Sequence, residues 1–469
     1  MPSPAASPSP RLAAVLDRVD RNLDGALARL CEFLRIPSVS TDPSHAGEVR
    51  RAGRWASDQL ASLGFTSTLV ETAGHPFVVA HHPGPGRGPR ILYYGHYDVQ
   101  PADPLALWRS GAFEPVIEEG PLGRRVVARG ACDDKGQVMT FIEAFRAWTE
   151  VHGAPPVPVT VMLEGEEESG SPSLEPFLAA HRETLAASIC VVSDTGMWDA
   201  ETPAITTMLR GLVYDEVILR GPSHDLHSGM YGGTLANPIN ALVEVLGALH
   251  DRDGRVAIPG FYEGIVDPPK EVLAAWRSLP FDEREFLGSA GVSIPHGEPG
   301  RTTMERMWSR PTCDVNGVWG GYAGRGAKTV IACEAGAKFS CRLVAGMDPE
   351  RIRRLLRGFI EDRLPPGITA EFHPHGVSPA IAVPVDGPLM QAARRGLRLA
   401  YGRDAAMIGT GGSIPAVGAI RRHLGIDSIL AGFGLDDDRV HSPNEKFEVC
   451  CLHGGTRAHA AMLEEFAKV

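Results

Sequence analysis

The stretch Val157-Pro158-Val159-Thr160-Val161-Met162-Leu163-Glu164-Gly165-Glu166-Glu167-Glu168-Ser169 decides the fold class. Its first half is a nearly unbroken apolar run, typical of a strand that is buried on both faces of a sheet. Three adjacent glutamates follow almost at once. Because adjacent carboxylates repel one another unless cations compensate, this position favours a cation site over an acidic loop in solvent. One of these carboxylates can bind a metal ion while its neighbour acts as a general base on water.

The sequence on both sides of this stretch alternates between strand-like and helix-like patterns. We expect strands at residues 66–70, 77–81, 90–94, 157–163 and 188–192, and helices at residues 12–34, 48–63 and 137–151. Such alternation predicts an α/β domain with a largely parallel sheet flanked by helices. Ligands of these sheets collect at the carboxyl ends of the strands, which is where the charged motifs of this chain fall.

The pattern changes near Arg210. We expect strands at residues 212–219, 328–333, 337–344 and 369–372, and helices that begin at Asn237-Pro238 and Asp348-Pro349. The order β-α-β-β-α-β predicts a ferredoxin-like domain, interrupted by a long insertion at about residues 251–327. After Ser378 the α/β pattern resumes, with helices at 389–399 and 452–466 around a strand at 428–432.

This organisation predicts one catalytic domain interrupted by a second domain. We expect a disordered tail at residues 1–10, the first part of the catalytic domain at 11–209, the inserted domain at 210–377 and the second part of the catalytic domain at 378–469. His441 lies in the last segment, yet metal-dependent chemistry would need it beside His96. One catalytic domain with an insertion is the simplest topology that brings these two histidines together.

Composition excludes several classes of function. The net charge of −11 argues against a nucleic-acid partner, because phosphate binding requires a basic face. No run reaches the length of a membrane span, so we expect no membrane partner, and the Pro/Ser/Ala-rich start does not resemble a signal peptide. The eight cysteines form neither a CxxC pair nor a disulfide framework, so we expect reduced thiols in a cytoplasmic protein.

Four further motifs supply residues suited to metal-dependent hydrolysis. They are Tyr94-Gly95-His96-Tyr97-Asp98, Arg129-Gly130-Ala131-Cys132-Asp133-Asp134-Lys135-Gly136, Val192-Ser193-Asp194 and His441-Ser442-Pro443-Asn444-Glu445. Taken singly, each has an ordinary explanation, such as a polar strand end, an acidic helix N-terminus or an exposed loop histidine. Together they provide two imidazoles and several carboxylates, a mixed N/O donor set that suits a pair of Zn²⁺ or Mn²⁺ ions.

These motifs, in this order and spacing, resemble the M20 family of di-zinc metallopeptidases. The resemblance runs from about residue 20 to the C-terminus and is strongest to the dipeptidase branch, which includes cytosolic non-specific dipeptidases and carnosinases. It implies hydrolysis of a small peptide with a free C-terminal carboxylate, two divalent ions per subunit and a homodimer formed through the inserted lid domain. Zn²⁺ is the first expectation for the metal, with Mn²⁺ and Co²⁺ as alternatives.

The resemblance also implies a role for each residue of the metal site. Asp133 would bridge the two ions, with His96 and Asp194 completing one and Glu168 and His441 completing the other. Glu167 would be the general base, and Asp98 would be the hydrogen-bond partner of His96. Glu166 is left without a role. The peptide bond between Asp133 and Asp134 is cis in the family and is expected to be cis here.

Further residues of the inserted domain are implied to contact substrate. His227, in Asp225-Leu226-His227-Ser228-Gly229, would reach into the partner subunit's active site and stabilise the oxyanion. Arg342 would hold the substrate carboxylate. The remaining substrate contacts implied by the resemblance are Thr329, Gly411, Gly412 and Ser413.

Two departures from the family pattern bear on specificity. Relatives in the dipeptidase branch commonly carry Arg-Glu before Gly411-Gly412-Ser413-Ile414-Pro415, whereas this chain has Gly409-Thr410. If that glutamate binds the free amine of the substrate, this change weakens the case for strict dipeptide preference. The second departure is Cys132, where relatives have a smaller or hydroxyl-bearing residue.

Three alternative functions remain open from the sequence. An N-acyl-amino-acid deacylase or desuccinylase and a glutamate-type carboxypeptidase use the same metals within the same family. A non-catalytic metal-binding or scaffold protein is the alternative of a different class, and the presence of all five presumed ligands and the base disfavours it.

Overall fold

The computed structural model describes residues 7–412 and 414–469, and it divides into two compact units. Unit 1 comprises residues 7–207, 383–408 and 415–469 of the described chain. Unit 2 comprises residues 208–382 and 409–412 with Ile414. Of the expected disordered tail at residues 1–10, residues 1–6 lie outside the described chain. Pro10 already belongs to the first helix, because Ser9 accepts a hydrogen bond from the Leu12 amide and caps it.

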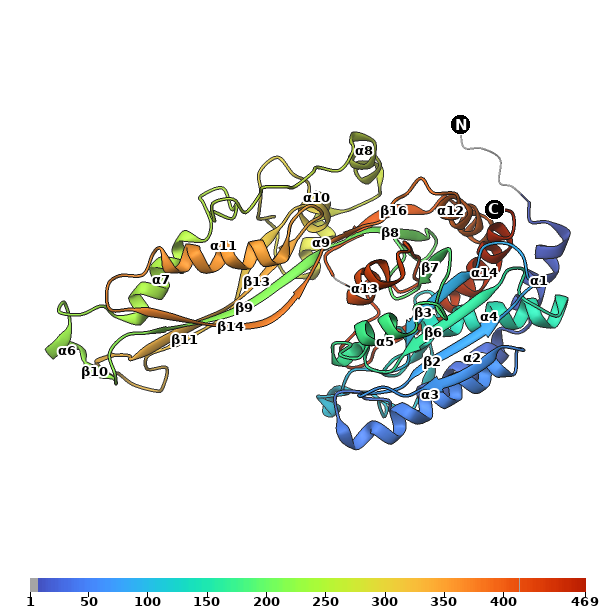
Figure 1. The fold of residues 1–469 in the computed structure, drawn as a ribbon, viewed down its shortest axis with the longest axis horizontal. Helices are drawn as coiled ribbons and strands as arrows, with labels where there is room; N and C mark the ends of the chain where they lie inside the picture. The colour runs from blue at the N-terminus through green and yellow to red at the C-terminus, as the bar shows by residue number, and fades with distance from the viewer. Residues whose placement is uncertain (1–6, 413) are drawn as a thin grey trace. The chain divides into compact units, whose positions relative to one another are not determined.

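The main sheet, most of which lies in unit 1, confirms the predicted α/β class (Figure 1). Its strands occur in the order β1 (Thr66–Val70), β2 (Phe77–His82), β6 (Val159–Glu164), β3 (Ile91–His96), β7 (Ile189–Val192), β17 (Ser428–Leu430) and β8 (Ala204–Leu209); β15 (Ile381–Ala382) and β16 (Ala406–Thr410) also pair with β8. Pairing is parallel among β6, β3, β7 and β17, whereas the β1–β2, β2–β6, β17–β8 and β15–β8 pairs are antiparallel. The parallel character is therefore confined to the centre, where the polar motifs follow the strands.

Helices cover this sheet in packed groups. The helices of unit 1 are α1 (Pro10–Arg21), α2 (Leu23–Leu34), α3 (Ala46–Ala61), α4 (Lys135–His152), α5 (Leu174–Ala180), α12 (Pro388–Tyr401), α13 (Pro415–Leu424) and α14 (Val449–Phe466). Helices α1, α4, α12 and α14 pack against one another, and α5 packs with α13. The single helix predicted over residues 12–34 is wrong, since the chain breaks at Asn22 and forms α1 and α2.

Unit 1 also contains small elements that the sequence did not predict. Three are short turns of 3-10 helix, at Pro43–His45, Leu105–Leu107 and Glu167–Ser169. Three strands form a separate antiparallel sheet in the order β18 (Lys446–Glu448), β5 (Gly123–Val127) and β4 (Val116–Gly120). This small sheet ties the segment after His441 to the segment before Asp133.

Unit 2 has the predicted ferredoxin-like topology. Its four antiparallel strands lie in the order β11 (Thr312–Gly320), β13 (Glu334–Leu343), β9 (Gly211–Arg220) and β14 (Thr369–Ser378). Helices α7 (Pro238–Ala248) and α11 (Pro349–Glu361) pack on this sheet, and their N-caps are Asn237 and Asp348, as predicted. The remaining elements are α6 (Ser228–Tyr231), α8 (Lys270–Ser278), α9 (Glu283–Ser289), α10 (Thr303–Ser309) and the short pair β10 (Leu226–His227) with β12 (Val330–Ile331).

The second strand of this domain differs from the prediction. Residues 328–333 do not enter the four-stranded sheet of unit 2. Only Val330 and Ile331 form a strand, which pairs with β10. The sheet strand is β11, which lies inside the expected insertion and carries a register shift between Val315 and Gly317. Its Asp, Asn and Gly residues have low β-propensity, so the pairing with β13 stabilises this strand more than its own sequence does.

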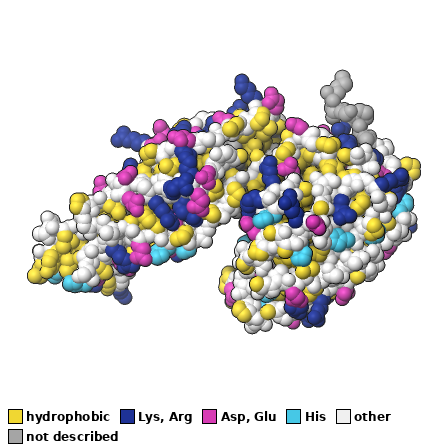
Figure 2. All heavy atoms as spheres, viewed as in Figure 1, with side chains coloured by type: hydrophobic (Ala, Val, Ile, Leu, Met, Phe, Trp, Pro, Cys, Tyr) yellow, Lys and Arg dark blue, Asp and Glu magenta, His cyan; other side chains and the backbone are white. Residues whose placement is uncertain are grey.

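Helix α11 combines a basic outer face with one inward ion pair. Figure 2 shows Lys and Arg side chains gathered over this helix. Arg357 of α11 donates two hydrogen bonds, of 2.7 and 2.9 Å, to the buried carboxylate of Asp215 on β9. This paired geometry compensates the charge that Asp215 brings into the core and fixes the helix on the sheet.

No helix of the described residues is both long and apolar enough to cross a bilayer.

A fully buried histidine links the end of β7 to α14. The Nε2 atom of His459 lies 2.9 Å from the Oγ atom of Ser193, the residue before Asp194. The ring packs edge-on against Tyr93, Phe141 and Phe433. Burial lowers the pKa of His459 to about 3, so the side chain is neutral in the folded protein.

We predict that His459 makes the protein acid-sensitive. Because its pKa is about 3 when folded and near 6.5 when unfolded, only the unfolded chain takes up this proton between those values. The free energy of unfolding should therefore fall with decreasing pH below 6.5, by up to about 1.4 kcal/mol per pH unit. Urea unfolding at several pH values should show a shallower dependence for His459→Gln than for the control His224→Asn, which alters an exposed histidine. Equal slopes for the two variants would contradict this assignment.

Candidate active site

The polar motifs lie at the carboxyl ends of the central strands, as predicted. His96 is the last residue of β3, and β6 ends at Glu164, just before the turn Glu167–Ser169. Asp194 follows β7 by two residues. Since β3 lies between β6 and β7, these three strand ends are neighbours at one edge of the sheet.

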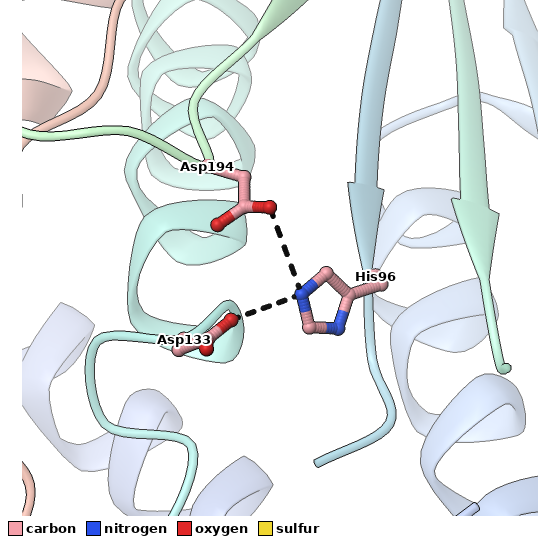
Figure 3. Close-up of side chains that lie close together, drawn as sticks. All are labelled: His96, Asp133 and Asp194. Atoms are coloured by element: carbon pink, nitrogen blue, oxygen red, sulfur yellow. Dashed lines mark hydrogen bonds and ion pairs between the residues drawn. The ribbon is translucent and has the colours of Figure 1, made fainter. Parts of the chain in front are cut away.

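The first group of potential metal ligands is His96, Asp133 and Asp194. Figure 3 shows the two carboxylates pointing toward one ring nitrogen of His96. The Nε2 atom of His96 lies 3.1 Å from Oδ1 of Asp133 and 4.0 Å from Oδ2 of Asp194. His96 is fully buried and Asp133 is buried, whereas Asp194 is partly exposed.

The second group is Asp133, Glu168 and His441. The Nε2 atom of His441 lies 2.9 Å from Oδ2 of Asp133 and 3.3 Å from Oε2 of Glu168. Asp133 therefore directs one carboxylate oxygen toward each histidine. Within each group the potential ligand atoms lie within 4.8 Å of one another. A carboxylate shared in this way is the arrangement required to bridge two metal ions.

Asp98 holds both His96 and the glutamate turn in place. The Nδ1 atom of His96 lies 3.1 Å from the backbone oxygen of Asp98 and 3.4 Å from its carboxylate. The same carboxylate accepts hydrogen bonds from the amides of Glu167 and Glu168, at 3.2 and 3.0 Å. A contact at Nδ1 orients the imidazole so that Nε2 is available to a ligand.

The three adjacent glutamates have different partners. Glu166 is buried and accepts hydrogen bonds from the amides of His75 and Ser173, at 2.9 and 2.6 Å, so it closes loops around the site. Glu168 accepts a hydrogen bond of 2.8 Å from Gln100. The Glu167 carboxylate accepts no hydrogen bond from the described residues, and it interacts with the charges of His96 and Asp194.

The electrostatics of the site fit cation binding. Burial, together with the neighbouring charges of Asp194 and Glu168, raises the pKa of Glu167 to about 8. Burial and the charge of Asp133 raise the pKa of Asp194 to about 7. Hydrogen bonds to Asp133 and Glu168 raise the pKa of His441 to about 10. The carboxylates outnumber the available positive charges, so a pair of divalent cations would neutralise the cluster and match its donor types.

The structure adds a residue that the sequence reasoning left without a role. Glu445 is fully buried and accepts hydrogen bonds of 2.9, 2.9 and 3.0 Å from the amides of Gly130, Cys132 and Asp133. It also pairs with Arg129 at 2.8 Å. Glu445 thus fixes the loop that presents Asp133. Its place in the same short motif as His441 was the available signal.

The residues after Asp133 brace the same loop. The peptide bond between Asp133 and Asp134 is cis, as the resemblance implied. The Asp134 carboxylate accepts a hydrogen bond of 3.1 Å from the His96 amide. Lys135 is fully buried and donates to the backbone oxygens of Phe33 and Ile36, at 3.2 and 2.7 Å.

The expected substrate-contacting residues fall in unit 2, in two places. His227 is exposed, and Thr329 lies close to it, because β10 pairs with β12 and the Thr329 carbonyl accepts a hydrogen bond from the Ser228 amide. Arg342 lies on β13, opposite Leu212 of β9. Gly411 and Gly412 both contact Arg210 through their carbonyl oxygens. Ser413 lies outside the described residues.

Local packing accounts for Gly409 and for Cys132, whereas nothing in the structure explains Thr410, which stands in the place of the family's glutamate. A Cβ atom on Gly409 would lie 2.5 Å from the Cβ atom of Trp308, so this tryptophan of α10 leaves no room for a larger residue. Cys132 is buried and packs against Gly434, and burial raises the pKa of its thiol. The thiol is therefore protonated at neutral pH, which agrees with a packing role.

Comparison with known families identifies this arrangement. The sequence model described as "Peptidase family M20/M25/M40" matches residues 92–465, which include every residue of both ligand groups. The chain belongs to this family. It is accordingly a hydrolase, and its described residues include two groups that could each hold a metal ion.

Relatives within the M20 family agree over nearly the whole chain. The chain is 29% identical to the Cys-Gly metallodipeptidase DUG1 of Saccharomyces cerevisiae, over 97% of this chain and 98% of the relative. It is 28% identical to the human Beta-Ala-His dipeptidase, over 99% and 95% of the two chains.

Solved M20 structures have the same fold. Dug1p from Saccharomyces cerevisiae has a TM-score of 0.81 at 28% identity, over 98% of this chain and 99% of that chain. The metallo-carboxypeptidase Sso-CP2 from Sulfolobus solfataricus has a TM-score of 0.83 at 29% identity, over 95% and 99%.

We predict that Glu445 controls metal affinity by orienting Asp133. Glu445→Gln keeps the shape but removes the negative charge and two acceptor lone pairs, so it should weaken binding of Mn²⁺ about 10- to 100-fold. Isothermal titration calorimetry of the metal-free protein measures this directly. Glu119→Gln, on exposed β4, is the matched control and should bind normally. Unchanged affinity in Glu445→Gln would show that the loop holds its geometry without this carboxylate.

Proposed function

We propose that this protein hydrolyses dipeptides that carry a free C-terminal carboxylate. The observation that carries the proposal is the pair of ligand groups sharing Asp133, with the Glu167 carboxylate free of hydrogen bonds from described residues beside them. The yeast and human relatives are both named as dipeptidases, which supports the substrate class.

We assign the roles of the site residues as follows. His96, Asp133 and Asp194 would hold one divalent ion, and Asp133, Glu168 and His441 would hold a second, so that Asp133 would be shared. Zn²⁺ is the metal that the donor set favours first, and Mn²⁺ and Co²⁺ are alternatives that the same donors accept. When bound, the ion pair polarises the scissile carbonyl and lowers the pKa of water.

The remaining chemistry belongs to the side chains. Glu167 takes a proton from the attacking water and passes it to the leaving amine. This role suits a carboxylate that lies beside the ligand groups and accepts no hydrogen bond from the described residues. Asp98 keeps His96 in the correct tautomer and holds the amides of Glu167 and Glu168.

Substrate recognition is assigned to unit 2. Arg342 holds the terminal carboxylate, and Thr329, Gly411, Gly412 and Ser413 provide further contacts. His227 acts on the active site of a second copy of the chain and stabilises the oxyanion, so the enzyme is a homodimer. Monomeric protein with full activity would contradict this role. The eight free cysteines support a cytoplasmic setting.

The decisive test is a mass-spectrometric turnover assay of the Zn²⁺- or Mn²⁺-loaded protein. The panel contains the dipeptides Cys-Gly, Ala-Ala and carnosine, the tripeptide Ala-Ala-Ala, and matched N-acetyl and N-succinyl amino acids. We expect cleavage of free dipeptides. Preferential cleavage of the acylated substrates would instead identify a deacylase. Preferential release of the C-terminal residue from the tripeptide would identify a carboxypeptidase, an activity named for the similar Sso-CP2 structure.

We predict separate effects on metal binding and on turnover. Glu167→Gln should keep two ions per subunit and lower kcat by at least about 10²-fold, because it removes the proton acceptor alone. His96→Ala and His441→Ala should each lose one ion, and Asp133→Ala should lose both. Metal content by mass spectrometry and kcat with Cys-Gly check these outcomes, and loss of metal in Glu167→Gln would move this residue into the ligand set.

A further inference from the structure

Arg210 lies against the glycine turn of unit 2. Its amide donates a hydrogen bond of 3.2 Å to the Gly412 carbonyl, and its side-chain Nε donates one of 3.3 Å to the Gly411 carbonyl. A Cβ atom on Gly411 would lie only 2.8 Å from Nη2 of Arg210. Glycine at this position therefore allows the guanidinium to lie directly against the backbone, in a fixed orientation.

The charge of Arg210 has no carboxylate partner within ion-pair distance in the part of the chain that the structure describes. The same holds for Arg342. Most other arginines of unit 2 are paired. Arg220, the last residue of β9, contacts Glu334 at 2.5 Å and Glu371 at 3.0 Å. A half-buried arginine without a carboxylate at ion-pair distance is costly to the folded protein, so this position suits an anion from outside the chain.

The side chains of Arg210 and Arg342 lie close enough to interact electrostatically. Arg342 on β13 is paired with Leu212, two residues after Arg210. Burial, together with the positive charge of Arg342, lowers the pKa of Arg210 to about 10, and the more distant Asp314 carboxylate opposes this shift only in part. Two guanidinium groups that repel one another define a local positive potential, which a single carboxylate would relieve.

We infer that Arg210 is a second arginine that binds the C-terminal carboxylate of the substrate, alongside Arg342 and the Gly411-Gly412 turn. This inference rests on the proposed function. Because Nε of Arg210 is already bonded to Gly411, its two Nη groups remain for the ligand, and the planar guanidinium fixes their direction. Arg210 thus determines the preference for a free carboxylate over a neutral C-terminus.

The test compares Ala-Leu with Ala-Leu amide, which differ only in the charge of the C-terminus. Binding is measured by calorimetry with the Mn²⁺-loaded Glu167→Gln protein, so that no turnover is required. We expect the acid to bind at least about tenfold more tightly than the amide, as a charge-assisted hydrogen bond predicts. Adding Arg210→Ala should reduce this ratio to below about twofold, and Arg210→Lys should restore only part of it.

Arg220→Ala is the matched control, since Arg220 is an exposed arginine of unit 2 that already has carboxylate partners. It should leave the acid-to-amide ratio unchanged. Thermal unfolding identifies a variant that fails to fold, in which case Arg210→Lys carries the comparison, because a merely structural role would not change the ratio.

The outcomes separate this inference from the proposed function. An unchanged ratio in folded Arg210→Ala or Arg210→Lys overturns the role of Arg210, even if the wild type cleaves dipeptides. Equal binding of acid and amide before Arg210 is changed, or binding of neither, overturns the carboxylate subsite. If the wild type cleaves no dipeptide while the ratio still depends on Arg210, the proposed function fails and the subsite stands.

Discussion

The active centre depends on one carboxylate, that of Asp133, whose two oxygens face two different histidines. His96 comes from the end of β3, and His441 comes from a loop far later in the chain. Such sharing requires the Asp133 loop to be fixed to within a few tenths of an ångström. Glu445 fulfils this requirement by accepting three backbone hydrogen bonds from residues 130–133 and pairing with Arg129. In the small sheet, β18, which directly follows Glu445, pairs with β5, which lies just before Arg129. This pairing holds the two segments next to each other.

The second constraint is the concentration of negative charge at the strand ends. Backbone amides offset part of it: those of Glu167 and Glu168 bond to Asp98, and those of His75 and Ser173 bond to Glu166. The rest remains uncompensated by the chain, and burial therefore raises the pKa values of Glu167 and Asp194. A site of this kind lowers the stability of the metal-free protein and gains affinity for divalent cations, because binding supplies the missing positive charge.

Unit 2 applies the opposite electrostatic principle. Arg210 and Arg342 have no carboxylate within ion-pair distance among the described residues, and they lie close enough to repel one another. The turn at Gly411 and Gly412 holds Arg210 in place. Trp308, from the insertion, fills the space beside Gly409. Gly409 and Trp308 thus pack together as a small and a large residue.

Much of the fold and of the candidate site followed from the sequence because the signals were local. Apolar runs at residues 157–163 and 188–192 predicted buried strands, Asn237 and Asp348 marked helix starts, and each polar motif directly followed a strand. These features depend on near neighbours in the chain. The tertiary structure alone decided what depends on distant partners. Strand β11 exists because β13 pairs with its Asp, Asn and Gly residues, Glu166 closes loops, and Glu445 holds residues more than three hundred positions away. No local sequence pattern predicts such contacts. The residue type of a buried carboxylate is the same whether it binds a metal ion, a backbone amide or an arginine.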